Sequence, residues 1–235
     1  MTFELSQEYQ AVRDRARGFA RDVVASKAAD IDRSGTVPEH IVAAEGLAAA
    51  AADLLATAVT TEEIAAVSGG AALAIALGKS GEDDTAAGLR GAPAPDRSPR
   101  AQIALTAVAL GIGRAALDHA LGQLRESSAH PGSDEKPHWA VADAATEIDA
   151  ARLLAFKAAA AHPGEQRDVE IAMARLMATS AADRAVDVAL RLGGSEAFTA
   201  GSLLDRLARD ARAVALLGGG EEAQRTVASA GLLPG

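Results

Sequence analysis

Alanine makes up about a quarter of this chain, whereas aromatic residues make up only 3%. Alanine has the highest intrinsic helix propensity, and β-sheets are built mainly from β-branched and aromatic residues. Four Phe, one Tyr and one Trp are too few to supply the packed faces of several strands. The sequence therefore predicts an all-α fold. Its 235 residues suffice for one large domain or two smaller ones.

The charge balance and the lack of cysteine exclude several classes of function. The net charge is −9, and no basic run is present of the kind that neutralises nucleic-acid phosphates. Without cysteine the chain forms no disulfide, thiolate nucleophile or cysteine-ligated metal site. No apolar stretch reaches about 18 residues without a charge or a helix breaker. Residues 1–10 lack the features of a signal peptide. We expect a cytoplasmic protein with no membrane span and no nucleic-acid partner.

Helical periodicity divides the chain into two groups of helices. In the first group, apolar residues recur at steps of three and four over residues 9–23, after Ser6 as the expected N-cap. Thr60 and Glu63 have the spacing of a capping box, which predicts that a helix begins there and runs to about Leu77. The second group consists of longer helices, expected at 98–125, 137–161, 169–192, 203–217 and 221–230. Long helices joined by short breaks predict an antiparallel bundle.

A glycine- and proline-rich segment, residues 79–99, separates the two groups. Its composition is typical of a linker or an exposed loop. The expected organisation is therefore an N-terminal helical domain over 1–78, a linker over 79–99 and a C-terminal helical bundle over 100–235.

Motif spacing alone predicts no catalytic or metal-binding residue. The five histidines are scattered, and no Glu-x-x-His pair accompanies the acidic side chains of residues 143–149. Gly218, Gly219 and Gly220 precede a helix and could present N–H groups to an anion, although a hinge needs the same glycines. Gly111 and Gly113 lie inside an alanine-rich helix, which indicates close helix packing.

Several sequence blocks are similar to acyl-CoA dehydrogenases. Residues 3–42 and 60–77 resemble the start and the end of that family's N-terminal helical domain. ALTAVALGIGRAALDHAL, ADAATEIDAAR, RLGG, RDAR and EEAQR resemble, in that order, its C-terminal four-helix domain. The resemblance covers most of the chain and implies two helical domains without the family's middle β domain, whose place residues 79–99 take.

The resemblance also implies where a catalytic base would stand. Family members use a glutamate to remove the α-proton of an acyl thioester while a hydride passes to flavin. Alignment on the RDAR and Gln-Arg motifs puts the usual base position at Gly218, and the alternative position used by some members falls at Ala101. Neither residue can accept a proton. Glu221 or Glu222 could substitute only after a shift of one helical turn. We therefore predict no catalytic residue, and whether the chain is an enzyme remains open.

FAD is the cofactor implied by the family, and Arg125 is the one cofactor-binding residue that we expect. Arg125 matches the arginine of an Arg-x-x-Phe-Gly motif whose Phe-Gly is lost, and an exposed arginine at a helix end would explain it equally well. The family's flavin-contacting Gln falls at Leu190, although Gly193-Gly194 after it remain. The CoA-contacting motif falls at residues 98–102 and is lost. The isolated chain could therefore bind no cofactor at all.

Three functions remain open. The chain could be a degenerate or partner subunit of a flavin-dependent acyl-CoA or acyl-carrier oxidoreductase, paired with a full-length acyl-CoA dehydrogenase. It could be a reduced but active FAD-dependent dehydrogenase built at a dimer interface, or a non-redox helical binding protein. In each case we expect a homo- or hetero-oligomer. Alanine runs at 48–52 and 158–161 are candidate contacts, with core packing as the alternative.

Overall fold

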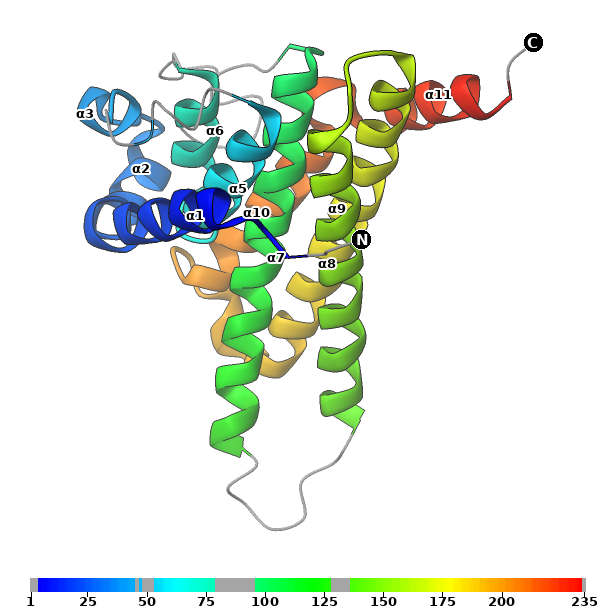
Figure 1. Ribbon diagram of the computed structural model, residues 1–235. Helices are drawn as coiled ribbons and strands as arrows, with labels where there is room; N and C mark the ends of the chain where they lie inside the picture. Colours follow the sequence, from blue (N-terminus) through cyan, green and yellow to red (C-terminus); the bar gives the residue numbers. More distant parts are fainter. Residues whose placement is uncertain (1–3, 45–46, 48–52, 79–95, 128–135, 234–235) are drawn as a thin grey trace.

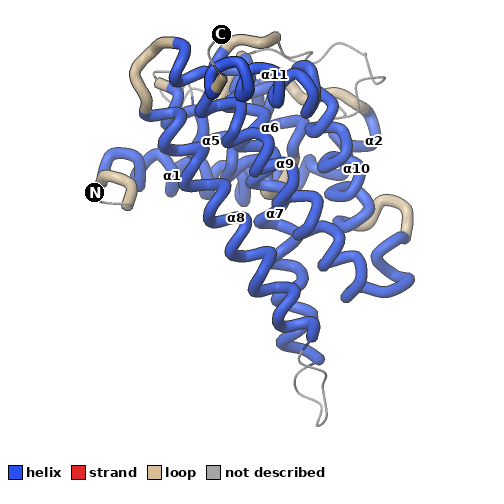
Figure 2. Tube along the Cα trace, turned by 90° about the vertical axis from the view of Figure 1, so that its right-hand side faces the viewer, coloured by secondary structure: helices blue, strands red, loops and turns tan. Residues whose placement is uncertain are grey.

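A computed structural model describes residues 4–44, 47, 53–78, 96–127 and 136–233. Within these ranges every regular element is helical and no strand occurs, which confirms the predicted all-α fold (Figure 2). Residues 79–95, most of the predicted linker, lie outside the described part, as does the alanine run at 48–52.

The helices before and after residues 79–95 are described as an N-terminal and a C-terminal group. The N-terminal group comprises α1 (Gln7–Phe19), α2 (Ala28–Ser34), α3 (Glu39–Val42), α5 (Leu54–Ala65) and α6 (Gly69–Leu77). A π-helical turn at Ala20–Val24 and a 3-10 turn at Ala25–Lys27 join α1 to α2. The C-terminal group comprises α7 (Pro99–Ser127), α8 (Lys136–Ala160), α9 (Glu165–Gly193), α10 (Leu203–Leu216) and α11 (Gly220–Leu232).

Helix α7 is the central element of the fold. It packs against α8, α9 and α10 of the bundle and also against α5 and α6, so it joins the two groups (Figure 1). By length and composition α7 could cross a membrane, but 78% of its most apolar window is buried inside the protein. Burial of this kind is expected for the core helix of a bundle.

Two glycines let α7 approach its neighbours closely, as their place in the sequence indicates. A Cβ on Gly111 would lie 2.5 Å from the carbonyl oxygen of Glu62 on α5. A Cβ on Gly113 would overlap Cδ1 of Ile148 on α8. The predicted role of both glycines in close packing is confirmed. Of the alanine run at 158–161, Ala158 and Ala159 are buried, which favours the core-packing alternative.

The predicted start of a helix at Thr60 is wrong. Helix α5 begins at Leu54, where the Asp53 carboxylate accepts a hydrogen bond from the Ala56 N–H at 2.7 Å. Thr60 and Glu63 therefore lie inside α5 and are buried. A second helix, α6, begins only after Ser68, whose hydroxyl caps the Ala71 N–H. Ser6 does precede α1 but makes no capping hydrogen bond.

Candidate functional site

The expected base position lies in a turn of three glycines between α10 and α11. Gly218, Gly219 and Gly220 all have positive φ, of 57°, 99° and 64°. This left-handed conformation strains any residue with a Cβ. The turn closes the end of α10 and starts α11 without a side-chain cap.

A buried arginine of α9 fills the space beside this turn. Arg175 is 1% exposed and donates hydrogen bonds to the carbonyl oxygens of Val214, Leu217 and Gly218, and to the side chain of Gln102. Among the described residues it forms no ion pair. Burial lowers the pKa of Arg175 to about 10, because the interior disfavours its charged form. A cation held by neutral acceptors thus occupies the region.

The packing around Gly218 leaves no room for a side chain. A Cβ there would lie 2.8 Å from Leu105 Cδ1, 2.9 Å from Gln102 Nε2 and 3.0 Å from Arg175 Nη1. The alternative position, Ala101, is fully buried at the start of α7.

The acidic residues after the turn do not replace a base at Gly218. Glu221 pairs with Arg225 on its own helix at 2.8 Å. Glu222 is exposed.

A largely apolar cavity of about 340 Å³ lies in the N-terminal group, between α3, α5, α6 and the start of α7. Its polar wall includes Thr57, Thr60 and Arg100, and Arg100 donates a hydrogen bond to Thr57 Oγ1 at 3.2 Å. The buried Thr60 Oγ1 has no hydrogen-bond partner among the described residues. The cavity can therefore take an apolar chain and offer one free hydroxyl to a polar group on it.

The expected cofactor residues do not assemble a phosphate site. Arg125 is exposed in the last turn of α7, and the last two residues of its matched motif lie outside the described part. Gly193, at the end of α9, borders a cavity of about 530 Å³ whose charged lining is Asp118, Glu126 and Glu196, with His119 beside them. Among the residues that the structure describes, no Lys or Arg lines this cavity. Three carboxylates in this lining would repel a pyrophosphate placed in the cavity.

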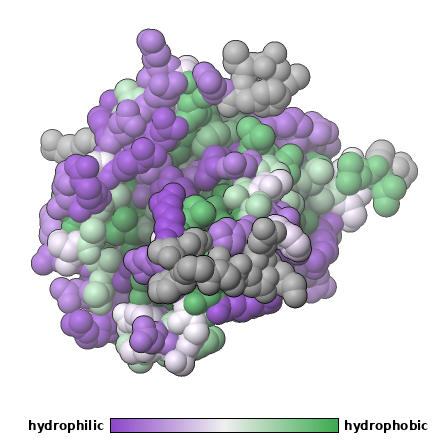
Figure 3. All heavy atoms as spheres, turned by 90° about the horizontal axis from the view of Figure 1, so that it is seen from below, coloured by the Kyte–Doolittle hydropathy of each residue, from purple (hydrophilic) through white to green (hydrophobic). Residues whose placement is uncertain are grey.

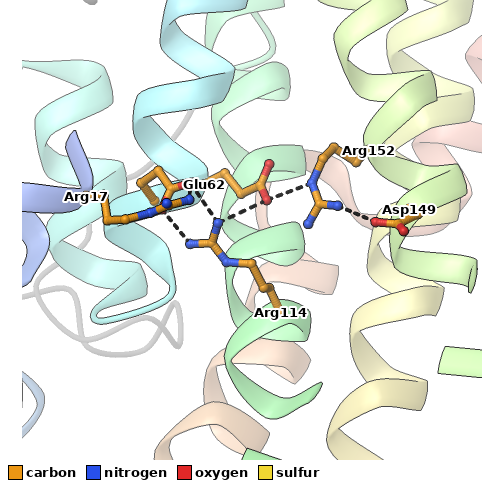
Figure 4. Close-up of polar contacts among 6 residues, drawn as sticks. Arg17, Glu62, Arg114, Asp149 and Arg152 are labelled. Carbon is orange, nitrogen blue, oxygen red and sulfur yellow. Dashed lines mark hydrogen bonds and ion pairs between the residues drawn. The ribbon is translucent and has the colours of Figure 1, made fainter. Parts of the chain in front are cut away.

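An extensive cluster of ion pairs joins α5 to three other helices (Figure 4). The sequence did not predict these contacts. Glu63 receives two hydrogen bonds from Arg17 of α1, at 3.0 and 3.1 Å, and two from Arg114 of α7, at 2.8 and 2.9 Å. Glu62 accepts from Arg152 Nε of α8 at 2.9 Å. Two adjacent glutamates within the apolar run TAVTTEEIAAV were the available signal.

The charge state of Glu63 follows from these contacts. Burial raises its pKa, but the hydrogen bonds from Arg114 and Arg17 outweigh burial and hold the pKa below its ordinary value. The glutamate is therefore ionised and is not a reservoir of protons.

A second buried carboxyl group behaves in the opposite way. Asp210 of α10 is 6% exposed, and burial, together with the charge of Asp32, raises its pKa to about 7 against the opposing effect of Arg206 and Arg209. Asp32 itself pairs with Arg209 at 2.8 Å. Asp210 lies away from every cavity described above and belongs to the packing of α10.

The histidines are dispersed in space as in sequence. His40, His138 and His162 are exposed and His119 is half-buried, while His130 lies outside the described residues. No group of three His, Asp or Glu side chains in the described ranges could hold a metal ion.

Comparison with known proteins identifies the C-terminal group. The family model for the C-terminal domain of acyl-CoA dehydrogenases matches residues 99–233. The chain is 32% identical to the 3-(aryl)acrylate reductase of Clostridium sporogenes over 56% of its own length and 36% of that protein. It is 34% identical to an acyl-CoA dehydrogenase of Bacillus subtilis, over 57% of its length and 36% of the relative. The chain thus matches about a third of the length of these curated relatives.

Solved structures extend the likeness to the whole fold. Butyryl-CoA dehydrogenase from Megasphaera elsdenii superposes with a TM-score of 0.78 at 16% identity, covering 99% of this chain and all of that one. A chain from the structure of the electron transferring flavoprotein of Acidaminococcus fermentans gives 0.81 at 16% identity, with complete coverage of both. At such identity the likeness concerns the fold alone. Taken with the match over residues 99–233, it means that this chain belongs to the acyl-CoA dehydrogenase family.

Proposed function

We propose that the chain is a degenerate member of its family that acts as a partner subunit of a flavin-dependent acyl-CoA or acyl-carrier oxidoreductase. The observation that carries this proposal is the contact between Arg175 and the Gly218 turn. Where the resemblance expects a carboxylate base, the chain has a glycine packed against a buried guanidinium group. Loss of a general base slows a proton-transfer step by about 10²–10⁴-fold. The partner, a full-length acyl-CoA dehydrogenase, supplies the base.

The charge near the expected cofactor residues supports the same proposal. The three carboxylates that line the cavity beside Gly193 would repel the pyrophosphate of FAD, and Arg125 is exposed and does not line that cavity. We infer that the isolated chain retains no flavin and that the partner subunit holds it.

Exposed apolar side chains offer a surface for such a partner. Trp139 and Leu153 of α8 are 61% and 46% exposed, and Leu232 and Leu233 at the end of α11 are 63% and 78% exposed. The apolar tip of α11 projects beyond a largely hydrophilic face of the molecule (Figure 3). Exposed apolar side chains on these two helices are candidate contacts for association. A subunit interface at α8 and α11 is consistent with the predicted oligomer.

The first experiment is the absorbance spectrum of the purified chain after gel filtration, with and without added FAD. A colourless protein that stays colourless agrees with the proposal. A flavin band that elutes with the protein contradicts it and favours the reduced, active dehydrogenase. Gel filtration of the chain mixed with a full-length relative then tests the partner role, because a complex is expected to elute before either protein.

The apolar cavity of the N-terminal group favours a second candidate, a non-redox binding protein for an acyl chain. Its test is displacement of a fluorescent fatty acid, with Leu73→Ala, a buried residue outside the cavity lining, as the control for general destabilisation. Thr60→Val should weaken binding of an acid with a polar headgroup and leave the binding of an alkane unchanged. Equal loss of both ligands would count against this candidate.

A further inference from the structure

A second cavity, of about 270 Å³, lies between the N-terminal group and the bundle, beside the cluster of Figure 4. Helices α1, α5, α7 and α8 supply its charged lining. These residues are Arg13, Arg17, Glu62, Glu63, Arg114 and Arg152. Four guanidinium groups therefore face two carboxylates.

This lining carries a net charge of +2 in a chain whose net charge is −9. Asp149 accepts a hydrogen bond from Arg152, but its side chain is 73% exposed and does not line the cavity. Water screens the Asp149 charge, so it compensates the cations of the lining only weakly. Asp14 and Asp118 also act on Arg17 and Arg114, but neither of them lines the cavity. The excess positive charge remains at the cavity.

The hydrogen bonds of the cluster leave one terminal nitrogen of Arg17 and one of Arg152 without a carboxylate among the described residues. Arg17 binds Glu63 through Nε and Nη2, which leaves Nη1 without a carboxylate among the described residues. Arg152 uses Nε for Glu62 and Nη1 for Asp149, which leaves Nη2. These donors come from two helices on opposite sides of α5.

Arg13 gives the most direct indication of a ligand. Its Nε is buried and has no hydrogen-bond partner in the described part of the chain. A buried donor without an acceptor costs about 1–3 kcal/mol, so such groups usually have a partner that completes them. Arg13 also lines the cavity, so a change of its rotamer would bring this donor to an acceptor held there.

We propose that this cavity binds a phosphate-class oxyanion, either inorganic phosphate or a phosphate monoester. Guanidinium groups bind phosphate through paired N–H donors, and a phosphate group carries a charge of about −1.5 to −2 near neutral pH. This charge matches the excess of +2 in the lining. A monocarboxylate would neutralise only half of it. The inference rests on the arginine cluster and is independent of the proposed subunit role.

The test is calorimetric titration of the full chain with inorganic phosphate in chloride buffer at low ionic strength. Arg13→Gln removes the unpartnered donor and breaks none of the ion pairs of the cluster. Arg15→Gln is the matched control, because it makes the same charge change on the exposed side of the same helix. We expect Arg13→Gln to weaken phosphate binding by at least about tenfold. Arg15→Gln should leave it within about twofold.

Two outcomes would overturn the proposal: no heat of binding with the wild-type chain, or the same loss in both variants. Thermal melting of each variant shows that it is folded, and Arg13→Lys, which keeps the charge but not the Nε donor, should bind with intermediate affinity. A parallel titration with phenyl phosphate, a monoester of the same charge class, separates the sources. Tighter, Arg13-dependent binding of that ester assigns the cavity to a phosphate monoester, and no gain in affinity assigns it to the free ion.

Discussion

Arg175 Nη1 would lie only 3.0 Å from a Cβ on Gly218, although the two residues belong to different helical segments of the bundle. The guanidinium group and a side chain at position 218 thus compete for one space. In this protein the arginine fills the space, and it donates hydrogen bonds from α9 to carbonyl oxygens at the end of α10. A residue without a side chain at position 218 and the buried cation beside it therefore depend on each other.

Gly218→Ala should destabilise the protein more than Gly201→Ala does. Both positions have positive φ, of 57° and 81°, so both substitutions pay backbone strain of about 1–2 kcal/mol. A Cβ at Gly201 has open space, whereas one at Gly218 meets Leu105, Gln102 and Arg175. We expect an additional loss of about 1–3 kcal/mol at Gly218, measured by urea unfolding. An equal decrease in the free energy of unfolding for both variants would mean that the turn accommodates a Cβ at position 218 without strain from these contacts.

Glu63→Gln should remove about 3 kcal/mol from the free energy of unfolding. The substitution leaves Arg114, whose side chain is only 21% exposed, without its main counter-charge. The loss of stability stays near about 3 kcal/mol, the lower end of the range for a broken buried pair, because Arg17 is more than half exposed. Asp149→Asn is the control, since its carboxylate is exposed and its pair with Arg152 contributes less than about 1 kcal/mol. Denaturant unfolding of both variants measures the difference. A result in which Asp149→Asn costs as much as Glu63→Gln would contradict this assignment.

The fold was predictable because its signals are local. Alanine content, apolar steps of three and four and the breaks between helices locate α7 to α11 within a few residues. The close approach at Gly111 and Gly113 was also predictable, because glycine inside an alanine-rich helix costs stability unless packing requires it.

The polar sites were not predictable, because their partners lie far apart in sequence. Arg175 lies in a helical sequence with no unusual feature. Its acceptors are main-chain carbonyl oxygens of a later turn, and every residue type has such an oxygen, so the sequence does not single them out. Thr60 and Glu63 have the three-residue spacing of a capping box, which predicts a helix start at Thr60. Asp53 was the true cap, and only the packing of α5 against α1 and α7 shows why Glu63 belongs inside the helix.

Asp210→Asn should stabilise the protein at pH 8 and leave it almost unchanged at pH 4. The pKa of Asp210 is raised to about 7 in the folded protein, against about 3.9 in the unfolded chain. Between these values the folded state binds the extra proton, so ionisation favours unfolding and the free energy of unfolding falls as pH rises. Asparagine does not ionise, so the Asp210→Asn variant does not lose stability in this way as pH rises. Urea unfolding from pH 5 to 8 should show a gap that widens up to about pH 7 and then stays constant. A gap independent of pH would mean that Asp210 titrates normally.

Gly111→Ala and Gly122→Ala should have opposite effects on stability, although both glycines lie within α7. Alanine favours a helix over glycine by about 0.5–1 kcal/mol, and a Cβ at Gly122 has no atom within 4 Å, so Gly122→Ala should raise the melting temperature. At Gly111 the same Cβ would lie 2.5 Å from the Glu62 carbonyl oxygen and 2.6 Å from Ala65 Cβ. Helices α5 and α7 would have to separate there, which would also pull Glu62 and Glu63 away from Arg114 and Arg152. Gly111→Ala should therefore lower the melting temperature and weaken phosphate binding in the arginine-lined cavity, whereas Gly122→Ala should leave that binding unchanged. If Gly111→Ala were as stable as the wild-type chain, the contact between α5 and α7 would be looser than the structure has it.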